Sequence, residues 1–346
     1  QGIVALILLG ALGYTTSLCT LLFVPGFWSM PASVITYVLL AVLCLALVFL
    51  VLLIREITVA QITFASDNRA TGVRMVTTFL YFFAIAAVIG LAWFNRRTIP
   101  SYAVANMISF ISVFLLGLLV FVGYFSCTEP PNFSPRVAQQ VNRWRPATRL
   151  LALPWLPGCY RGYLFCLIHV IPLLIVNGWF WQNFATRMGP SGFAKPAVAV
   201  AVGIYVLFYA GLATFISAIF HGRNPSVRST LVRASFLTFI AFMAVLPHFV
   251  VTLVEEWRSI RIGFGVHYLT SPFATIAESS IVDRHGNTAR FVTVISALIL
   301  SSLVLLVVNF AGLATTILRT LTPLQYRVPA PQESDQVAQT EVASQS

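Results

Sequence analysis

Residues 102–126 read YAVANMISFISVFLLGLLVFVGYFS, a run without a single charged side chain. At 1.5 Å of rise per residue, a helix of this length crosses the roughly 30 Å hydrocarbon core of a bilayer. Similar runs recur along the 346-residue chain, whose mean hydropathy is +0.88. Only 9% of its residues are charged, whereas soluble domains have about a quarter. The sequence therefore predicts an all-α, polytopic transmembrane helical bundle.

Length and hydropathy indicate about eight spans. They are expected near residues 2–24, 33–54, 75–94, 102–126, 162–185, 197–220, 234–254 and 291–317. The corresponding organisation is a first four-helix membrane half (1–126), a linker with an interfacial helix (127–161) and a second four-helix half (162–320) that contains an outer segment (255–290). The remaining residues, 321–346, form a polar tail that is expected to be disordered.

Basic residues predict the orientation of the bundle. Thirteen arginines fall after spans two, four and six or in the C-terminal segment, against eight basic residues on the opposite side. The thirteen are Arg55, Arg69, Arg74, Arg136, Arg143, Arg145, Arg149, Arg161, Arg223, Arg228, Arg233, Arg319 and Arg327. Because short cytoplasmic loops carry the excess of basic residues, both chain ends are expected to be cytoplasmic. The net charge of +11 is therefore assigned to lipid headgroups at helix ends, and no nucleic-acid partner is expected.

A polar stretch, ITFASDNRATGVRM (62–75), separates two of these apolar runs. Asp67 or Asn68 is placed to cap the helix that begins near Gly72. Arg74 is then expected among the headgroups, where arginine anchors helix ends. The alternative is that this stretch docks a cytoplasmic partner.

The linker contains SPRVAQQVNRWRPATRLLALPWLPGCYR (134–161). In a helix, Val137, Val141 and Trp144 share one face, and Arg136 and Arg143 flank it. This pattern predicts a helix lying in the cytoplasmic membrane interface. Two roles are open: an anchor for anionic lipids, or an elbow that transmits movement from a cytoplasmic partner.

Intramembrane histidines raise the question of a haem or metal site. His169 and His248 differ in predicted depth by roughly 10 Å, so they are poorly placed to share one ion or one haem. Each lies near a proline, Pro172 or Pro247, whose freed carbonyl could accept an imidazole N–H. We therefore expect structural histidines, no metal and no cofactor. The sequence has no charged residue at mid-span and no recognised catalytic motif, so no catalytic residue is nominated.

A short internal repeat connects two of the spans. VLFYAGLAT (206–214) and VVNFAGLAT (307–315) share five consecutive residues. Ala210 and Gly211 in the first copy, and Ala311 and Gly312 in the second, form small-residue surfaces that permit close helix packing. The repeat reflects either a duplicated helix pair or chance similarity within an apolar alphabet.

The outer segment, 255–290, is too rich in apolar and aromatic residues for a free loop. We expect a short amphipathic or re-entrant helix packed on the outer ends of spans seven and eight. Its first turn would contain Pro272, with Ser271 as the cap.

Three further motifs are AGLATFISAIFHGRN (210–224), YLTSPFATI (268–276) and LVLLIREITVAQITFASDNRATGVRM (50–75). Together they resemble the membrane subunit of bacterial ABC-2-type exporters. The resemblance implies a permease-like subunit of a bacterial inner membrane, energised by a separate ATPase subunit and either dimeric or joined to other membrane subunits. It also allows the chain to be the C-terminal part of a longer permease. Candidate contacts with partners are Asp67, Arg69, Arg74, Arg136, Arg143, Arg145, Arg149, Arg223 and Arg228.

Two other functions are open on the sequence alone. A non-catalytic accessory subunit of a larger membrane complex would explain the uncharged spans and the small-residue faces. A membrane enzyme would have to use loop residues, and His267, Glu278, Asp283 and His285 do not assemble into a recognisable site.

Overall fold

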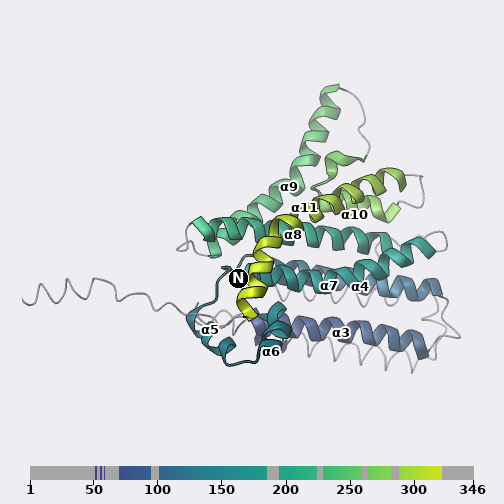
Figure 1. Cartoon of the computed structure of the whole chain (residues 1–346). Coiled ribbons are helices and arrows are strands. Elements are labelled where there is room, and N and C mark those ends of the chain that lie inside the picture. The colour runs from purple at the N-terminus through teal and green to yellow at the C-terminus, as the bar shows by residue number, and fades with distance from the viewer. Residues whose placement is uncertain are drawn as a thin grey trace, which may run out of the picture.

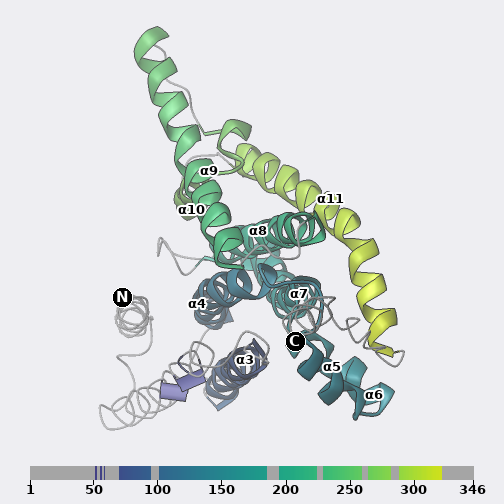
Figure 2. The same cartoon turned by 90° about the vertical axis from the view of Figure 1, so that its left-hand side faces the viewer.

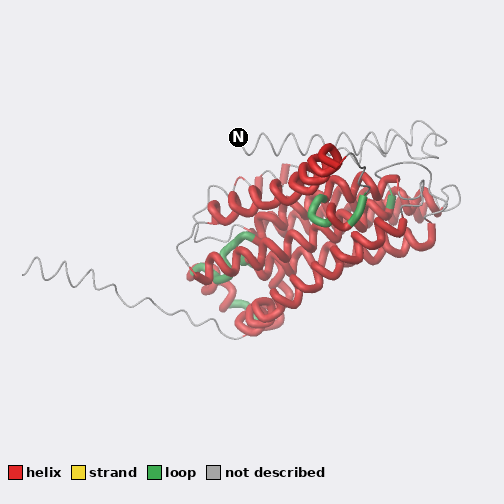
Figure 3. The backbone as a smooth tube through the Cα atoms, turned by 90° about the horizontal axis from the view of Figure 1, so that it is seen from above, coloured by secondary structure: helices red, strands yellow, loops and turns green. Residues whose placement is uncertain are grey.

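The computed structural model describes residues 70–94, 101–184, 195–223, 229–258, 264–281 and 288–321, together with Val51, Leu52, Arg55, Glu56 and Thr58. Within these residues all regular structure is helical (Figure 3). The first expected span, all but two residues of the second and the C-terminal tail lie outside the described residues.

Five helices are long and apolar enough to cross a membrane. They are α4 (Ser101–Cys127), α7 (Cys159–Phe184), α8 (Pro196–Arg223), α9 (Ser229–Arg258) and α11 (Thr288–Leu321) (Figure 1). A sixth apolar helix, α3 (Ala70–Phe94), precedes them and is apolar over the shorter stretch Thr71–Ala87. The all-helical, multi-pass membrane class is confirmed with five candidate spans in the described residues. The total of eight spans and the cytoplasmic chain ends stay predictions.

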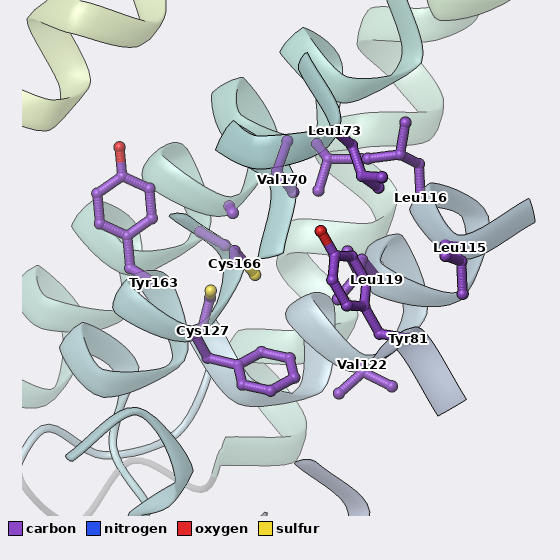
Figure 4. Packing of buried hydrophobic residues seen from close by; sticks show 14 of the residues in the cluster. Tyr81, Leu115, Leu116, Leu119, Val122, Cys127, Tyr163, Cys166, Val170 and Leu173 are labelled. Atoms are coloured by element: carbon purple, nitrogen blue, oxygen red, sulfur yellow. The ribbon is translucent and has the colours of Figure 1, made fainter. Parts of the chain in front are cut away.

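The core lies between four neighbouring helices, α3, α4, α7 and α8, which are seen nearly end-on in Figure 2. Leu115, Leu116 and Leu119 of α4 face Tyr81 of α3, and α7 adds Val170 among other buried residues (Figure 4). The cluster joins helices that precede the 127–161 linker to helices that follow it. The predicted division into two membrane halves is therefore bridged by one continuous core.

One glycine sets the distance between α4 and α7. A Cβ atom added to Gly162 would lie 2.5 Å from the backbone carbonyl of Ser126 and 2.8 Å from its Cβ. Because these are mainly backbone atoms, a rotamer change cannot remove the clash, and one of the two helices would have to shift as a whole. A residue without a side chain is therefore required at the start of α7.

Two spans leave this core. The most apolar stretch of α8 is 61% buried, whereas that of α9 is 11% buried and that of α11 is 22% buried. In Figure 2, α9 and α11 diverge from α8, and the far end of α9 extends beyond its neighbours. Their exposed apolar side chains are suited to contact with a lipid bilayer.

The linker forms two short helices where one was expected. They are α5 (Pro135–Asn142) and α6 (Pro146–Ala152), followed by a 3₁₀ turn, η2 (Leu153–Trp155). Pro146 explains the interruption, because it disfavours the helical conformation of Arg145 and has no N–H to continue α5. Arg145 accordingly has an extended backbone, with φ −66° and ψ 150°.

The outer segment also contains two short elements, a 3₁₀ turn, η4 (Val266–Tyr268), and α10 (Pro272–Ile281). The prediction that a short helix begins at Pro272 is confirmed. α10 packs mainly on α8 and more lightly on α11, whereas η4 contacts α9 and α11. The prediction that this segment packs on spans seven and eight was therefore incomplete. Its main packing surface is α8, the sixth expected span.

Candidate functional site

Charged side chains gather at the end of the bundle where α3 and α7 begin and where α4 and α8 end. We call it the arginine-rich end, and define it by Arg74, Glu129, Arg149, Arg161 and Arg233. Hydrogen bonds join these segments directly: Arg233 of α9 donates to the Thr128 hydroxyl after α4 (3.1 Å), and Ser217 of α8 donates to the Glu129 carbonyl (3.2 Å). Loops that were assigned to one membrane side thus meet at one end of the structure.

Arg74 is completely buried at the centre of this end. Its Nη2 pairs with the Glu129 carboxylate at 3.0 Å, and its Nε donates to the Ser126 hydroxyl at 3.0 Å. Its Nη1 donates to the carbonyls of Pro154 (3.1 Å) and Leu156. The expected headgroup position of Arg74 is therefore not observed. The 153–156 segment folds over the start of α3 and supplies the acceptors that headgroups would have provided.

Glu129 extends the connection from Arg74 to α7. Its carboxylate oxygen also accepts the backbone N–H of Gly158 at 2.7 Å, directly before α7 begins. A carboxylate at this position is favoured by the partial positive charge of a helix N-terminus. One acidic residue therefore joins α3, α4 and α7.

A second chain of hydrogen bonds crosses from η2 to α7. The indole Nε1 of Trp155 donates to the Thr78 hydroxyl (2.9 Å), which lies 3.0 Å from His169 Nε2. His169 Nδ1 lies 2.8 Å from the Phe165 carbonyl, so the proton is assigned to Nδ1, and Nε2 accepts from Thr78. His169 is thus a structural histidine, as expected, although its carbonyl partner is not one freed by Pro172.

The short helices α5 and α6, with η2, form a folded unit that we call the linker platform (Pro135–Trp155). Val137 and Val141 are buried against Leu156, and Arg149 donates to the carbonyls of Asn142 (2.8 Å) and Trp144 (2.9 Å). The prediction that this apolar face meets the membrane was wrong for the two valines. Leu156, directly after η2, covers them together with the half-buried Phe133.

The outer surface of the platform is both apolar and basic. Leu150 and Leu151 are 45% and 75% exposed, and Trp144 is 38% exposed. Arg143 and Arg145 are exposed beside them. This composition suits a membrane interface or a protein partner.

The two copies of the internal repeat meet each other and α7. Asn309 of the second copy donates its amide to the Gly211 carbonyl of the first, at 2.9 Å. A Cβ on Gly211 would lie 3.1 Å from Leu305, and one on Gly312 would collide with the ring of Tyr160. Both glycines therefore lie at close helix contacts. Ala210 is also buried, whereas Ala311 is exposed and makes no equivalent contribution.

At the opposite end, α10 is held to α8 through tyrosine hydroxyls. Tyr205 lies 2.8 Å from the Thr275 hydroxyl, and Tyr209 donates to the Thr270 carbonyl at 2.6 Å. His248 Nε2 lies 3.1 Å from the Ser271 hydroxyl. A serine–histidine pair is a familiar nucleophile arrangement, but Ser271 is completely buried, so we assign the pair to tethering.

The structure divides the predicted partner-contact residues into three groups. Arg136, Arg143 and Arg145 are exposed on the platform, whereas Arg74 and Arg149 are buried and bonded within their own chain. Asp67, Arg69, Arg228 and the side chain of Arg223 lie outside the described residues. Sequence reasoning missed Glu129, Trp155 and Gly162, which lack any repeat or periodic pattern that would single them out.

In the described part of the chain, no three His, Cys, Asp or Glu side chains are grouped to hold a metal ion. Comparison with known proteins finds that no family model, curated protein or solved structure matches this chain. The resemblance to ABC-2-type exporters therefore depends on the three sequence motifs alone.

Proposed function

We propose that this chain is a permease-like membrane subunit of an ABC-2-type exporter in a bacterial inner membrane, energised by a separate ATPase subunit. The observation that supports this proposal best is the firm attachment of the linker platform to the membrane helices. In this proposal the arginine-rich end faces the cytoplasm, where the ATPase is found.

The attachment has three parts. Thr71 of α3 donates to the Trp155 carbonyl at 2.7 Å, while the Trp155 indole donates to the Thr78 hydroxyl about two helix turns further along α3. The platform helix α6 also packs against α11. A partner that moves the platform would thereby move α3 and α11, because hydrogen bonds and packing transmit displacement between joined elements.

Charge reversal on the outer platform tests the proposal. We expect affinity-tagged chain to recover a nucleotide-binding subunit, and the double variant Arg143→Glu/Arg145→Glu to lower that recovery and the associated ATPase activity. The matched control is Arg290→Glu, since Arg290 is exposed at the start of α11. Equal recovery for both variants, or no nucleotide-binding subunit with the unaltered chain, would contradict the proposal.

A second candidate is a non-catalytic accessory subunit that packs among other membrane subunits. It is favoured by α9, where Ala234, Thr238 and Ala241 lie on one exposed face at helical spacing. Inside the bundle, the Asn177 amide of α7 also donates to the Ser112 hydroxyl of α4 at 2.8 Å. Both features suit a static packing role.

The two candidates predict different effects of substitutions on α9. An accessory subunit should lose its membrane partners in Ala234→Leu/Ala241→Leu, but keep them in the control Ala86→Leu on the exposed face of α3. Recovery of structural or redox subunits without any ATPase would favour this role. Unchanged partner recovery in the α9 variant would count against it.

A further inference from the structure

The arginine-rich end has more buried positive charge than negative charge. Arg74 and Arg161 are 0% and 4% exposed, and both lie within electrostatic reach of Glu129. The Glu129 carboxylate is already engaged by Arg74 and by the N–H of Gly158. One carboxylate cannot balance two buried guanidinium groups, so a net positive charge is left beside Arg161.

The contacts of Arg161 leave part of its guanidinium unused. Its Nη1 donates to the Pro157 carbonyl at 2.7 Å, and its Cζ lies 3.6 Å from the centre of the Phe133 ring. Its Nε is buried without a hydrogen-bond partner. A buried charged donor that is left unpaired is strongly destabilising unless a further group satisfies it.

The start of α7 adds a second source of positive potential. This helix is 26 residues long, and the residue before it is Gly158, with φ +125° and no side chain to cap the first turn. A Cβ at Gly158 would lie 2.8 Å from Arg161 Nη1 and 3.3 Å from the Pro131 carbonyl, so only glycine permits this close approach. The helix dipole adds positive potential at this position, and the Glu129 carboxylate that accepts the Gly158 N–H offsets only part of it.

From these observations we propose that Arg161 and the first turn of α7 bind a phosphate group. A planar guanidinium beside the N–H groups of a helix start matches the geometry of phosphate oxygens. The group comes either from an anionic lipid headgroup, since this is an end of the membrane spans, or from free phosphate. The site is independent of any ATPase.

Thermal unfolding of the full-length chain in nanodiscs distinguishes the two sources. One sample contains phosphatidylcholine alone and is titrated with inorganic phosphate against sodium chloride of equal ionic strength. The other contains increasing fractions of phosphatidylglycerol without added phosphate. A saturable rise of the midpoint in the first sample identifies free phosphate, and a rise in the second alone identifies a lipid headgroup.

Substitution then assigns the response to the site. Arg161→Gln should weaken the apparent affinity about tenfold or more, because a hydrogen bond to a charged group is lost, and Arg161→Lys should weaken it less. Arg290→Gln removes the same charge from an exposed position at the start of α11, outside the platform, and should keep the wild-type response. An unchanged response in Arg161→Gln, or no response of the unaltered chain to either anion, would overturn the proposal.

If Arg161→Gln does not fold, the proposal can still be tested with a second measurement on the unaltered chain. Native mass spectrometry of protein extracted from membranes should then show one retained anionic lipid or phosphate. Complete delipidation without loss of the fold, in the absence of phosphate, would overturn the proposal in that case.

Discussion

The hydroxyl of Thr270 donates a hydrogen bond of 2.9 Å to the backbone carbonyl of Met243 in α9. Met243 is four residues before Pro247, which lies inside the helix and has no N–H to offer that carbonyl. The turn before α10 therefore satisfies a backbone group that the proline leaves open. Since Tyr209 of α8 in turn donates to the Thr270 carbonyl, one residue joins the interrupted region of α9 to the core of the bundle.

Replacing Thr270 by valine tests how much the hydrogen bond to the Met243 carbonyl contributes to stability. We expect Thr270→Val to lower the free energy of unfolding in detergent by about 1–3 kcal/mol, because the Met243 carbonyl is left without a donor. The cost should be smaller in a Pro247→Ala background, where residue 247 regains an N–H. Thr238→Val is the control, since Thr238 bonds within its own helix and is exposed. An equal cost of Thr270→Val with and without Pro247 would contradict the explanation.

The buried pair of Arg74 and Glu129 should be sensitive to removal of either partner. Arg74→Gln and Glu129→Gln are each expected to cost about 3–5 kcal/mol, because each leaves a buried charge uncompensated. The double variant should cost less than the sum, as expected for residues in direct contact. Equilibrium unfolding in mixed micelles provides the four free energies, and Arg143→Gln should change the unfolding free energy by no more than about 0.5 kcal/mol. Strict additivity of the two single effects would refute direct coupling.

For Arg74, the sequence predicted the neighbouring membrane span but not the burial of the side chain. Its span was predictable because hydropathy depends only on local composition, and α3 does contain the expected 75–94 segment. Its burial was not predictable, because the covering carbonyls of Pro154 and Leu156 are some 80 residues away in the chain. A basic residue beside a polar stretch was assigned to headgroups, the usual environment of such a residue.

The linker illustrates the same limit. The spacing of Val137 and Val141 correctly indicated a helical face that needs cover. Periodicity cannot show whether lipid or protein provides that cover, and here Leu156 of the same chain provides it. The glycines differ in a similar way. The internal repeat singled out Gly211 and Gly312, whose added Cβ atoms would meet side chains, whereas no sequence pattern singled out Gly162, whose added Cβ would meet the backbone of Ser126.

Gly162 therefore provides a sharp test of helix packing. Gly162→Ala should destabilise the protein by about 1–3 kcal/mol or more, because the added methyl group meets the Ser126 carbonyl and the two helices must separate. Gly117→Ala in α4 is the control, since nothing lies within 4 Å of its added Cβ. That change should be neutral or stabilising by roughly 0.5–1 kcal/mol, as for glycine to alanine in an open helix. Equal midpoints of thermal unfolding for the two variants would contradict the packing.

The orientation of the bundle can be tested through two exposed residues at its opposite ends. Arg143 lies on the linker platform at the arginine-rich end, and His267 lies in η4 near α10. The excess of arginines predicts that the first end is cytoplasmic. In intact cells, a membrane-impermeant thiol reagent should therefore label His267→Cys and should label Arg143→Cys only after the membrane is permeabilised.

Native cysteines limit the background of this experiment. Cys127, Cys159 and Cys166 are free thiols with no exposed surface, and Cys19 and Cys44 lie outside the described residues, so the unaltered chain is measured in parallel. The reverse labelling pattern would place the platform outside the cell, where no ATPase could reach it, and would end the permease proposal. Labelling of both variants in intact cells would contradict the assignment of the two residues to opposite sides of the membrane.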